Sequence, residues 1–327
     1  MDKQNSFYTI SLNSSIDYSF YLSADIVYDD INRIKESRID AGGKGLNVAR
    51  MLTELGCSCT ALTFIGGETG EKLKLLLESE GVQYLYVNTK GSVRNVYNFF
   101  SKGRVLRFNE TGSHISCTEK KNFFALFDNI HFRTGDILLI SGSLPPGVEK
   151  DIYRKIIEAG KKKGLYTVLD TDGEALSEGI KALPDVIKPN IWEIERIAGQ
   201  RISSSSVLSE VLEDLVKKGI STVALTLGDK GALFFSREYL LYASVPQVKV
   251  ESTVGCGDAF IGGFLYGLYK KKSACECLKW AAASGTAKAT MKGTLMPGKK
   301  EIRKIIEKVK VSNVHIDELS PVFNNRK

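Results

Sequence analysis

The segment from Thr253 to Asp258 sets Gly255 and Gly257 on either side of Cys256, directly before an aspartate and an apolar stretch. Glycines let the main chain come close to a ligand, and the first N–H groups of a helix, together with its dipole, favour an anion. The amides of Gly255, Cys256 and Gly257 would therefore hold an anion beside the carboxylate of Asp258. That chemistry suits group transfer from a phosphate donor. The same pattern also makes an ordinary loop and helix start.

Cys256 is also a candidate nucleophile, because a thiol at a helix N-terminus can have a lowered pKa. The histidines that would serve as its base, His114, His131 and His315, are distant from it in sequence. The alternative is that Cys256 is a small residue that contributes only its N–H group.

A second glycine-rich segment runs from Asp40 to Arg50. Its glycines precede a helical pattern whose first turn carries Lys44 and Asn47, which offers a polyhydroxy ligand a close backbone and hydrogen-bonding side chains. The segment is neither a Walker loop nor a Gly-x-Gly-x-x-Gly dinucleotide turn. Its other interpretation is a tight turn with an exposed lysine.

Short β-rich runs alternate with amphipathic helical segments, the pattern of a mostly parallel sheet with helices on both faces. The predicted central strands are Phe7–Leu12, Thr60–Ile65, Ile137–Ile140, Thr167–Leu169, Val186–Ile187 and Thr222–Leu227. The predicted helices are Leu46–Leu55, Glu71–Glu80, Lys150–Lys163, Ser205–Lys218, Ala259–Lys270 and Ala274–Met291. The fold class is therefore α/β, and we expect a single domain over residues 1–327.

Two regions, about 15–39 and 93–109, alternate polar and apolar residues without a helix of their own. Such strands predict a small second sheet that projects as a lid over a site. The alternative is a pair of hairpins at the domain edge. An exposed apolar face on this sheet would favour a homodimer.

The net charge of +7, from 45 Lys and Arg against 38 Asp and Glu, is dispersed rather than gathered into one tract. Nucleic-acid binding is therefore not indicated, whereas a mildly basic chain suits an anionic small substrate. The first eight residues lack an apolar block of the signal-peptide type, and no run approaches the roughly 20 apolar residues of a membrane span. We expect a cytoplasmic protein.

The two glycine motifs resemble the two signatures of the PfkB carbohydrate kinases, the ribokinase-like family. Five further segments agree with that family in order: residues 13–17, 141–147, 170–176, 188–193 and 226–232. Seven ordered segments within residues 7–309 are a specific signal, whereas either glycine motif alone is not. The resemblance implies a ribokinase-like three-layer α/β/α sandwich with a β-sheet lid that often pairs two subunits.

Within that family the chain is most similar to the hexose-phosphate kinases. Lys44, the Asn32-Arg33 pair and residues 91–95 resemble the kinases of fructose 1-phosphate and tagatose 6-phosphate. The resemblance implies transfer of the γ-phosphate of MgATP to a primary hydroxyl of a ketohexose phosphate. Fructose 1-phosphate is the expected acceptor, and tagatose 6-phosphate and then fructose 6-phosphate are the alternatives. A sugar-phosphate sensor without turnover is the alternative of another class.

The resemblance assigns roles to residues at both ends of the site. Asp258 would accept the proton of the attacking hydroxyl while the neighbouring amides neutralise the transferred phosphoryl group. Sugar hydroxyls would be bound by Asp17, Gly43 and Asn47, with Ser143 nearby. Arg94 and Lys44 are the candidates for the phosphate already on the sugar, since a guanidinium matches phosphate geometry and an ammonium adds a point charge.

For the nucleotide, a strand end followed by a helix start brings together Lys188, Asn190 and Glu193. The last two are candidates for Mg²⁺, held through water. Thr226 and Gly228 close the neighbouring strand end, a usual ligand position in such sheets. Their alternatives are an Asn-capped helix and a hairpin turn. Carbonyls around Ser252, Val254 and Gly293 are candidates for K⁺, as in some relatives.

The chain departs from the family pattern mainly in the lid. Val93 replaces the usual Thr before Arg94, and the Arg107-Phe108 pair differs from the commoner acidic-apolar pair. Elsewhere, Ser14 stands where Pro is usual and Cys256 where Ala is usual. These changes preserve the phosphotransfer centre and leave the choice of sugar open.

Overall fold

The main sheet is a buried layer because its strands carry apolar side chains on both faces. The computed structural model describes residues 5–320 of the chain. Ten strands lie in the order β14 (Lys310–Asn313), β13 (Leu240–Ser244), β12 (Ala232–Phe235), β11 (Thr222–Thr226), β10 (Val186–Ile187), β9 (Tyr166–Asp170), β8 (Ile137–Ser141), β1 (Phe7–Ser11), β4 (Cys59–Gly66) and β5 (Gln83–Thr89). Pairs from β5 to β11 are parallel, and those from β11 to β14 are antiparallel.

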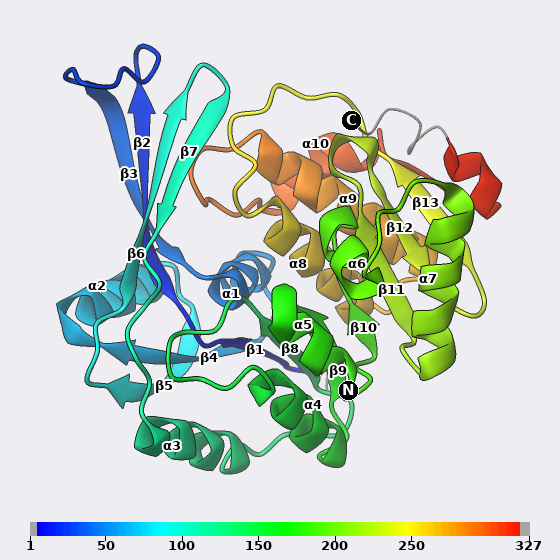
Figure 1. Ribbon diagram of the computed structural model, residues 1–327, viewed down its shortest axis with the longest axis horizontal. Coiled ribbons are helices and arrows are strands. Elements are labelled where there is room, and N and C mark those ends of the chain that lie inside the picture. The colour runs from blue at the N-terminus through cyan, green and yellow to red at the C-terminus, as the bar shows by residue number, and fades with distance from the viewer. Residues whose placement is uncertain (1–4, 321–327) are drawn as a thin grey trace.

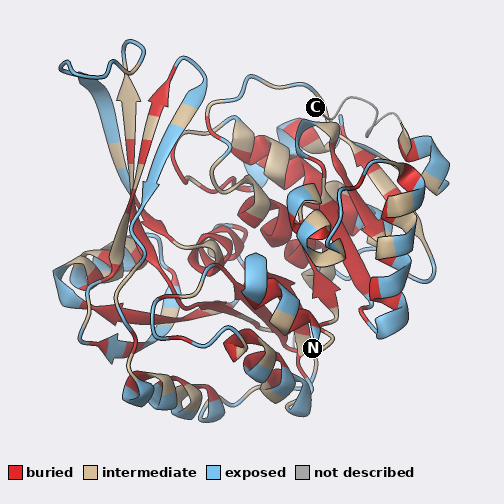
Figure 2. Cartoon of the chain, in the orientation of Figure 1, coloured by how far each residue is buried: buried red, intermediate tan, exposed pale blue. Residues whose placement is uncertain are grey.

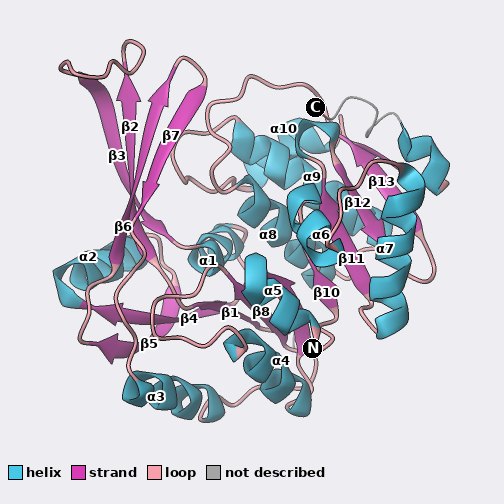
Figure 3. Ribbon diagram, in the orientation of Figure 1, coloured by secondary structure: helices cyan, strands magenta, loops and turns pink. Residues whose placement is uncertain are grey.

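Helices cover both faces of this sheet, as Figures 1 and 3 show. One core cluster packs the sheet against α1 (Lys44–Glu54), α2 (Gly67–Ser79), α8 (Cys256–Tyr269), α9 (Ala274–Ala289) and α10 (Lys299–Ile306). The other packs it against α3 (Cys117–Asp128), α4 (Ile152–Lys162), α5 (Gly173–Ile180), α6 (Ile191–Ala198) and α7 (Ser205–Lys218). Within the described residues, none of the helices combines the length and the apolar character that crossing a membrane requires.

A second sheet, the lid, stands away from the main sheet at the left of Figure 1. Its strands lie in the order β3 (Ile34–Gly42), β2 (Ser15–Leu22), β6 (Arg94–Ser101) and β7 (Arg104–Asn109). Aromatic rings stack across β2 and β6, Tyr18 on Tyr97 and Phe20 on Phe99, with centroids 5.4 and 5.1 Å apart. Figure 2 shows that much of the outer strands β3 and β7 is exposed.

The predicted α/β class, the mostly parallel sheet and the lid are confirmed. All six predicted strands lie in the main sheet, and the predicted helices correspond to α1, α2, α4, α7, α8 and α9 with shifted ends. The patterns miss the strands β5, β12, β13 and β14 and the helices α3, α5, α6 and α10. Most of these elements are only four to eight residues long, too short to give a clear periodic signal.

Candidate functional site

The start of α8 has the geometry of an anion site. Gly255 is its N-cap with a φ of 80°, a left-handed conformation that glycine adopts without strain. No side chain within residues 5–320 caps this end by a hydrogen bond, so its first N–H groups are left for a ligand or water. The Cys256 N–H donates to the Thr253 carbonyl at 3.4 Å, a long bond that partly occupies one of the three predicted amides.

Asp258 lies in the first turn of α8 and is only 5% exposed. Its Oδ2 accepts a hydrogen bond from Nδ2 of Asn47, on α1, at 2.8 Å. Burial and then the charge of Asp170 raise the pKa of Asp258 to about 6, although Lys44 and the Asn47 hydrogen bond oppose the shift. This carboxylate is ionised at neutral pH and is a stronger base than an exposed aspartate.

The thiol of Cys256 is poorly placed for nucleophilic chemistry. Its Sγ donates to the Ser252 carbonyl at 3.7 Å. Burial raises the pKa of Cys256 to about 11, so the thiolate is scarce at neutral pH.

Two lysines bring positive charge to the same place. Oδ1 of Asp170, the last residue of β9, pairs with Nζ of Lys44 at 3.3 Å and with Nζ of Lys188 at 3.0 Å. A Cβ on Gly257 would lie 3.4 Å from Nζ of Lys188, so this ammonium stands beside the start of α8. Burial lowers the pKa of Lys44, but the carboxylates of Asp170 and Asp258 outweigh it and raise that pKa.

Asp170 lies within this candidate site, although the sequence patterns alone do not single it out. It is fully buried, and its Oδ2 has no hydrogen-bond partner among the described residues. The available signal is an aspartate at the carboxyl end of a predicted strand, the edge at which open α/β sheets bind ligands.

At the predicted nucleotide end, Asn190 is the N-cap of α6. Its Oδ1 accepts the N–H groups of Trp192 and Glu193 at 2.9 and 3.0 Å, so the amide oxygen is used by the helix. Oε2 of Glu193 accepts the Asn190 N–H at 2.8 Å, which completes a capping box. Glu193 is nevertheless 6% exposed and lies in the electrostatic field of Lys188 and Asp170.

The neighbouring strand end carries the other two predicted nucleotide residues. Thr226 forms an isolated parallel bridge with Asn190, and its N–H donates to the Pro189 carbonyl at 3.0 Å. Gly228 turns the chain directly after β11 with a φ of 66°. The capped helix and the turn, the two alternatives to nucleotide binding, are therefore both present. They occur together with the ion pairs of Asp170 with Lys44 and Lys188.

The predicted sugar residues gather where the lid meets the main sheet. Asp17 of β2 is 5% exposed and accepts a hydrogen bond from Oγ of Ser15 at 2.6 Å. Burial raises its pKa to about 6, while this hydrogen bond and the charges of Arg50 and Arg94 oppose the shift. Gly43, with a φ of 109°, is the N-cap of α1.

Arg94, the first residue of β6, faces the same region. Its Nε donates to the Asn13 carbonyl at 3.2 Å and its Nη1 to the Glu110 carbonyl at 3.0 Å. Nδ2 of Asn13 in turn donates to Oγ of Ser143 at 3.2 Å. Asn13 and Arg94 also line a small cavity, together with Ser92 and Ser113.

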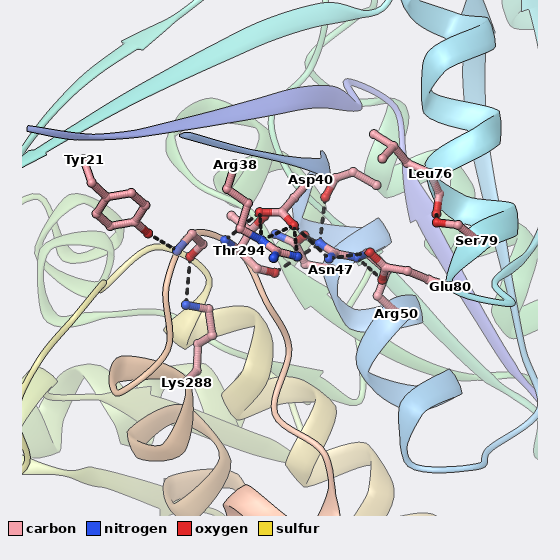
Figure 4. Close-up of polar contacts among 12 residues, drawn as sticks. Tyr21, Arg38, Asp40, Asn47, Arg50, Leu76, Ser79, Glu80, Lys288 and Thr294 are labelled. Carbon is pink, nitrogen blue, oxygen red and sulfur yellow. Dashed lines mark hydrogen bonds and ion pairs between the residues drawn. The ribbon is translucent and has the colours of Figure 1, made fainter. Parts of the chain in front are cut away.

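A buried polar network joins Asn47, which holds Asp258, to the lid. Figure 4 shows this network from Asn47 to the lid residues Arg38 and Asp40. Nη1 of Arg50 donates to Oδ1 of Asn47 at 3.2 Å and to the Thr294 carbonyl at 3.1 Å, and its other nitrogens bind Glu80. Asp40 of β3 accepts the Thr294 N–H at 3.3 Å. Arg50 thus holds the side chain of Asn47, a contact that the glycine motif alone does not reveal.

The lid also reaches the loop before α8. Nη2 of Arg107, on β7, donates to Oγ1 of Thr253 at 3.2 Å. Arg107, one of the two lid residues that depart from the family pattern, therefore contacts the loop that leads into the start of α8.

The chain is similar to known proteins over most of its length. The model of the pfkB family carbohydrate kinases matches residues 10–300. The chain is 34% identical over 283 residues to a 1-phosphofructokinase of Bacillus subtilis, which covers 86% of this chain and 92% of that protein. It is 31% identical over 284 residues to a tagatose-6-phosphate kinase of Staphylococcus epidermidis, with 86% and 91% covered.

Among solved structures, the fold is similar to phosphofructokinase-2 of Escherichia coli in complex with potassium. The TM-score is 0.87 at 30% sequence identity, and the match covers 93% of this chain and 99% of that one.

Proposed function

The chain belongs to the pfkB family of carbohydrate kinases and is therefore a phosphotransferase, and from this premise we propose its acceptor. The acceptor is a ketohexose phosphate with a free primary hydroxyl, and fructose 1-phosphate is the first candidate. The donor is the γ-phosphate of MgATP. The observation that carries the transfer chemistry is the convergence of Asp258, Lys44 and Lys188 at the start of α8. Fructose 1-phosphate is placed first because of the 34% identity to a 1-phosphofructokinase. A base and two cations beside open helix amides suit transfer of a phosphoryl group to a hydroxyl.

The residues divide the work of the reaction. Asp258 accepts the proton of the attacking hydroxyl, and Asn47 keeps its carboxylate in place. Lys44 and Lys188, with the amides of α8, neutralise the charge that builds up on the transferred group. Asp17 holds sugar hydroxyls, and Arg94 pairs with the phosphate already on the sugar.

The residues present fit Mg²⁺. Oδ2 of Asp170 is a buried carboxylate oxygen without a partner among the described residues, and Glu193 lies in its field. Carboxylate oxygens are the ligands that Mg²⁺ prefers, with water completing its shell. Asp170 and Glu193 would therefore hold the ion, with Asn190 at the edge of the site. When bound, Mg²⁺ neutralises charge on the nucleotide phosphates.

The test is a coupled ADP assay with three acceptors. Fructose 1-phosphate offers its free 6-hydroxyl, whereas tagatose 6-phosphate and fructose 6-phosphate offer a 1-hydroxyl. We expect the highest specificity constant with fructose 1-phosphate. A preference for tagatose 6-phosphate would support the second acceptor instead. Background ADP formation with all three, combined with a ligand-induced rise in Tm, would mean that the protein is a sensor.

We also propose that two copies pair through the lid. Apolar side chains are exposed on its outer strands, among them Ile34 and Ile39 of β3 and Phe108 of β7. Covering such a face stabilises a dimer. Light scattering of Phe108→Asp should then give a monomer where the unmodified protein gives a dimer, and equal masses would contradict pairing through this face.

A further inference from the structure

Lys288 is a lysine that the proposed chemistry does not use. It lies in the last turn of α9 and has 0% exposure. Its Nζ donates to the Gly293 carbonyl at 3.0 Å. A buried ammonium is costly unless its charge is needed or compensated where it lies, so this placement requires an explanation.

The aliphatic stem of Lys288 reaches the start of α8. A Cβ on Gly255 would lie 3.4 Å from Cε of Lys288. The N–H groups of Glu251 and Ser252 donate to the Ala289 carbonyl at 2.8 and 3.2 Å, so the loop before α8 is tied to the residue that follows Lys288. The ammonium therefore stands between the anion-site loop and the loop that contains Gly293.

The charged neighbours of Lys288 are mostly acidic. Burial, the largest influence, lowers the pKa of Lys288, while the carboxylates of Asp258 and Asp40 oppose that change. Arg50 is the cationic neighbour that acts with burial. The loop of Gly293 is also held from the lid, because its N–H donates to the Tyr21 hydroxyl at 2.6 Å (Figure 4).

Gly293 is one of the carbonyls that the sequence offers for K⁺, with those near Ser252 and Val254. A K⁺ ion at this site would be coordinated by the Gly293 carbonyl oxygen, which already accepts a hydrogen bond from the Lys288 ammonium. Two unit charges a few ångströms apart repel by several kcal/mol at an effective dielectric constant near 20. The residues of this chain therefore do not fit a monovalent cation at this position.

We propose that the ammonium of Lys288 is a built-in replacement for a monovalent cation. It supplies a fixed positive charge behind the start of α8 and holds the Gly293 loop against the loop before α8. The proposal rests on the proposed kinase function only for its effect on rate. The proposal predicts that neither the activity nor the stability of the protein responds specifically to K⁺.

The experiment compares wild type with Lys288→Ala and Lys288→Met in KCl and in tetramethylammonium chloride at equal ionic strength. Rate and Tm are measured for each. Lys279→Ala is the matched control, because it removes a partly exposed lysine from the same helix. For wild type and for the control, the rate in KCl should be within about two-fold of the rate in tetramethylammonium chloride, since neither protein depends on a bound cation.

Lys288→Ala removes the charge and opens space. We expect its rate in tetramethylammonium to fall at least about ten-fold, within the range for loss of one oriented charge, and K⁺ to restore part of that rate and raise its Tm. Lys288→Met fills the space without the charge, so it should fold well yet stay slow in both salts.

Three results would overturn the proposal: a wild-type rate that K⁺ raises ten-fold, full activity of Lys288→Met, or a slow Lys288→Ala that K⁺ changes in neither rate nor Tm. The last result would mean that Lys288 contributes only to the packing of the loops around it. If wild type is inactive with every acceptor, the proposed function fails. The Tm comparison between the two salts still decides the role of Lys288.

Discussion

Nδ2 of Asn47 donates to Oδ2 of Asp258 at 2.8 Å and joins the two glycine motifs across 211 residues of sequence. The contact fixes the carboxylate that begins α8 against the first turns of α1. Because Arg50 holds Oδ1 of the same Asn47, the amide has one orientation in which both of its ends are used. The position of the candidate base is thus set by α1 and not by α8 alone.

Asp258→Asn should abolish general-base assistance while keeping the contact with Asn47, since an Asn oxygen can still accept from Nδ2. We expect kcat to fall by about 10²–10⁴-fold and KM for both substrates to stay within a few-fold. Steady-state kinetics with each substrate varied in turn measures both quantities. Near-wild-type turnover would remove Asp258 from the mechanism.

The same substitution should stabilise the fold at neutral pH. The folded pKa of Asp258, about 6, is above its ordinary value of 3.8, so ionisation is disfavoured in the folded state. This penalty is fully present above about pH 6 and disappears below the unfolded pKa. Replacing the carboxylate by a neutral amide should therefore increase the free energy of unfolding by up to roughly 2–3 kcal/mol at pH 8.

Denaturant unfolding at several pH values tests this stability effect. The advantage of Asp258→Asn over wild type should shrink as the pH falls from 8 to 4. A stability advantage that is absent at pH 8, or one that grows in acid, would show that the ionised carboxylate of Asp258 does not destabilise the folded protein.

Asn47→Ala should shift the pH dependence of the reaction. The Asn47 hydrogen bond lowers the pKa of Asp258, so its loss should raise that pKa above about 6. The base must be ionised, which means that kcat falls as pH drops through its pKa. The acidic limb of kcat should therefore move to higher pH in Asn47→Ala. A limb that stays in place while the rate falls would mean that Asn47 affects the reaction through the sugar and not through the pKa of Asp258.

The glycine motifs and their neighbours can be predicted from sequence because their chemistry is local. A glycine N-cap before Asp258, or glycines before Lys44, need only a few adjacent residues. The α/β alternation is equally readable, since strands buried on both faces are continuously apolar. Asn190 can be recognised as a helix cap for the same reason.

Residues that act through distant contacts give no such signal. Arg50 binds the Thr294 carbonyl 244 residues away, and in sequence it is only the end of a glycine-rich helix start. Lys288 looks like an ordinary basic residue in a last helical turn until its burial is seen. Asp170 needs the neighbouring strand ends to bring Lys44 and Lys188 to it.

Cys256→Ala should remain active, because the proposed chemistry uses only the main chain at this position. The buried thiol has a pKa of about 11 and donates to the Ser252 carbonyl at 3.7 Å. Alanine preserves the N–H group and the small volume, so no transition-state interaction is removed and we expect kcat within about three-fold of wild type. A dead variant with an unchanged Tm would instead favour a thiol enzyme.

Arg94→Lys should weaken binding of the sugar phosphate more than it slows catalysis. Arg94 already holds the Asn13 and Glu110 carbonyls through Nε and Nη1, which fixes the plane of its guanidinium beside the cavity. A lysine can neither make both backbone bonds nor bind a phosphate with two parallel N–H groups. We expect KM for the sugar phosphate to rise by about 10–100-fold, the loss of one charged bidentate contact.

The KM for MgATP serves as the internal control for Arg94→Lys, because the proposed nucleotide residues lie elsewhere, Lys188 directly after β10 and Glu193 on α6. It should stay within about two-fold, and kcat should fall only a few-fold, since uniform binding energy affects KM and not kcat. Arg104→Lys, on the exposed strand β7, is a matched control for the same chemical change. Equal increases in both KM values would mean that Arg94 supports the lid as a whole. An unchanged KM for the sugar phosphate would mean that Lys44 or another cation of the site binds this phosphate instead of Arg94.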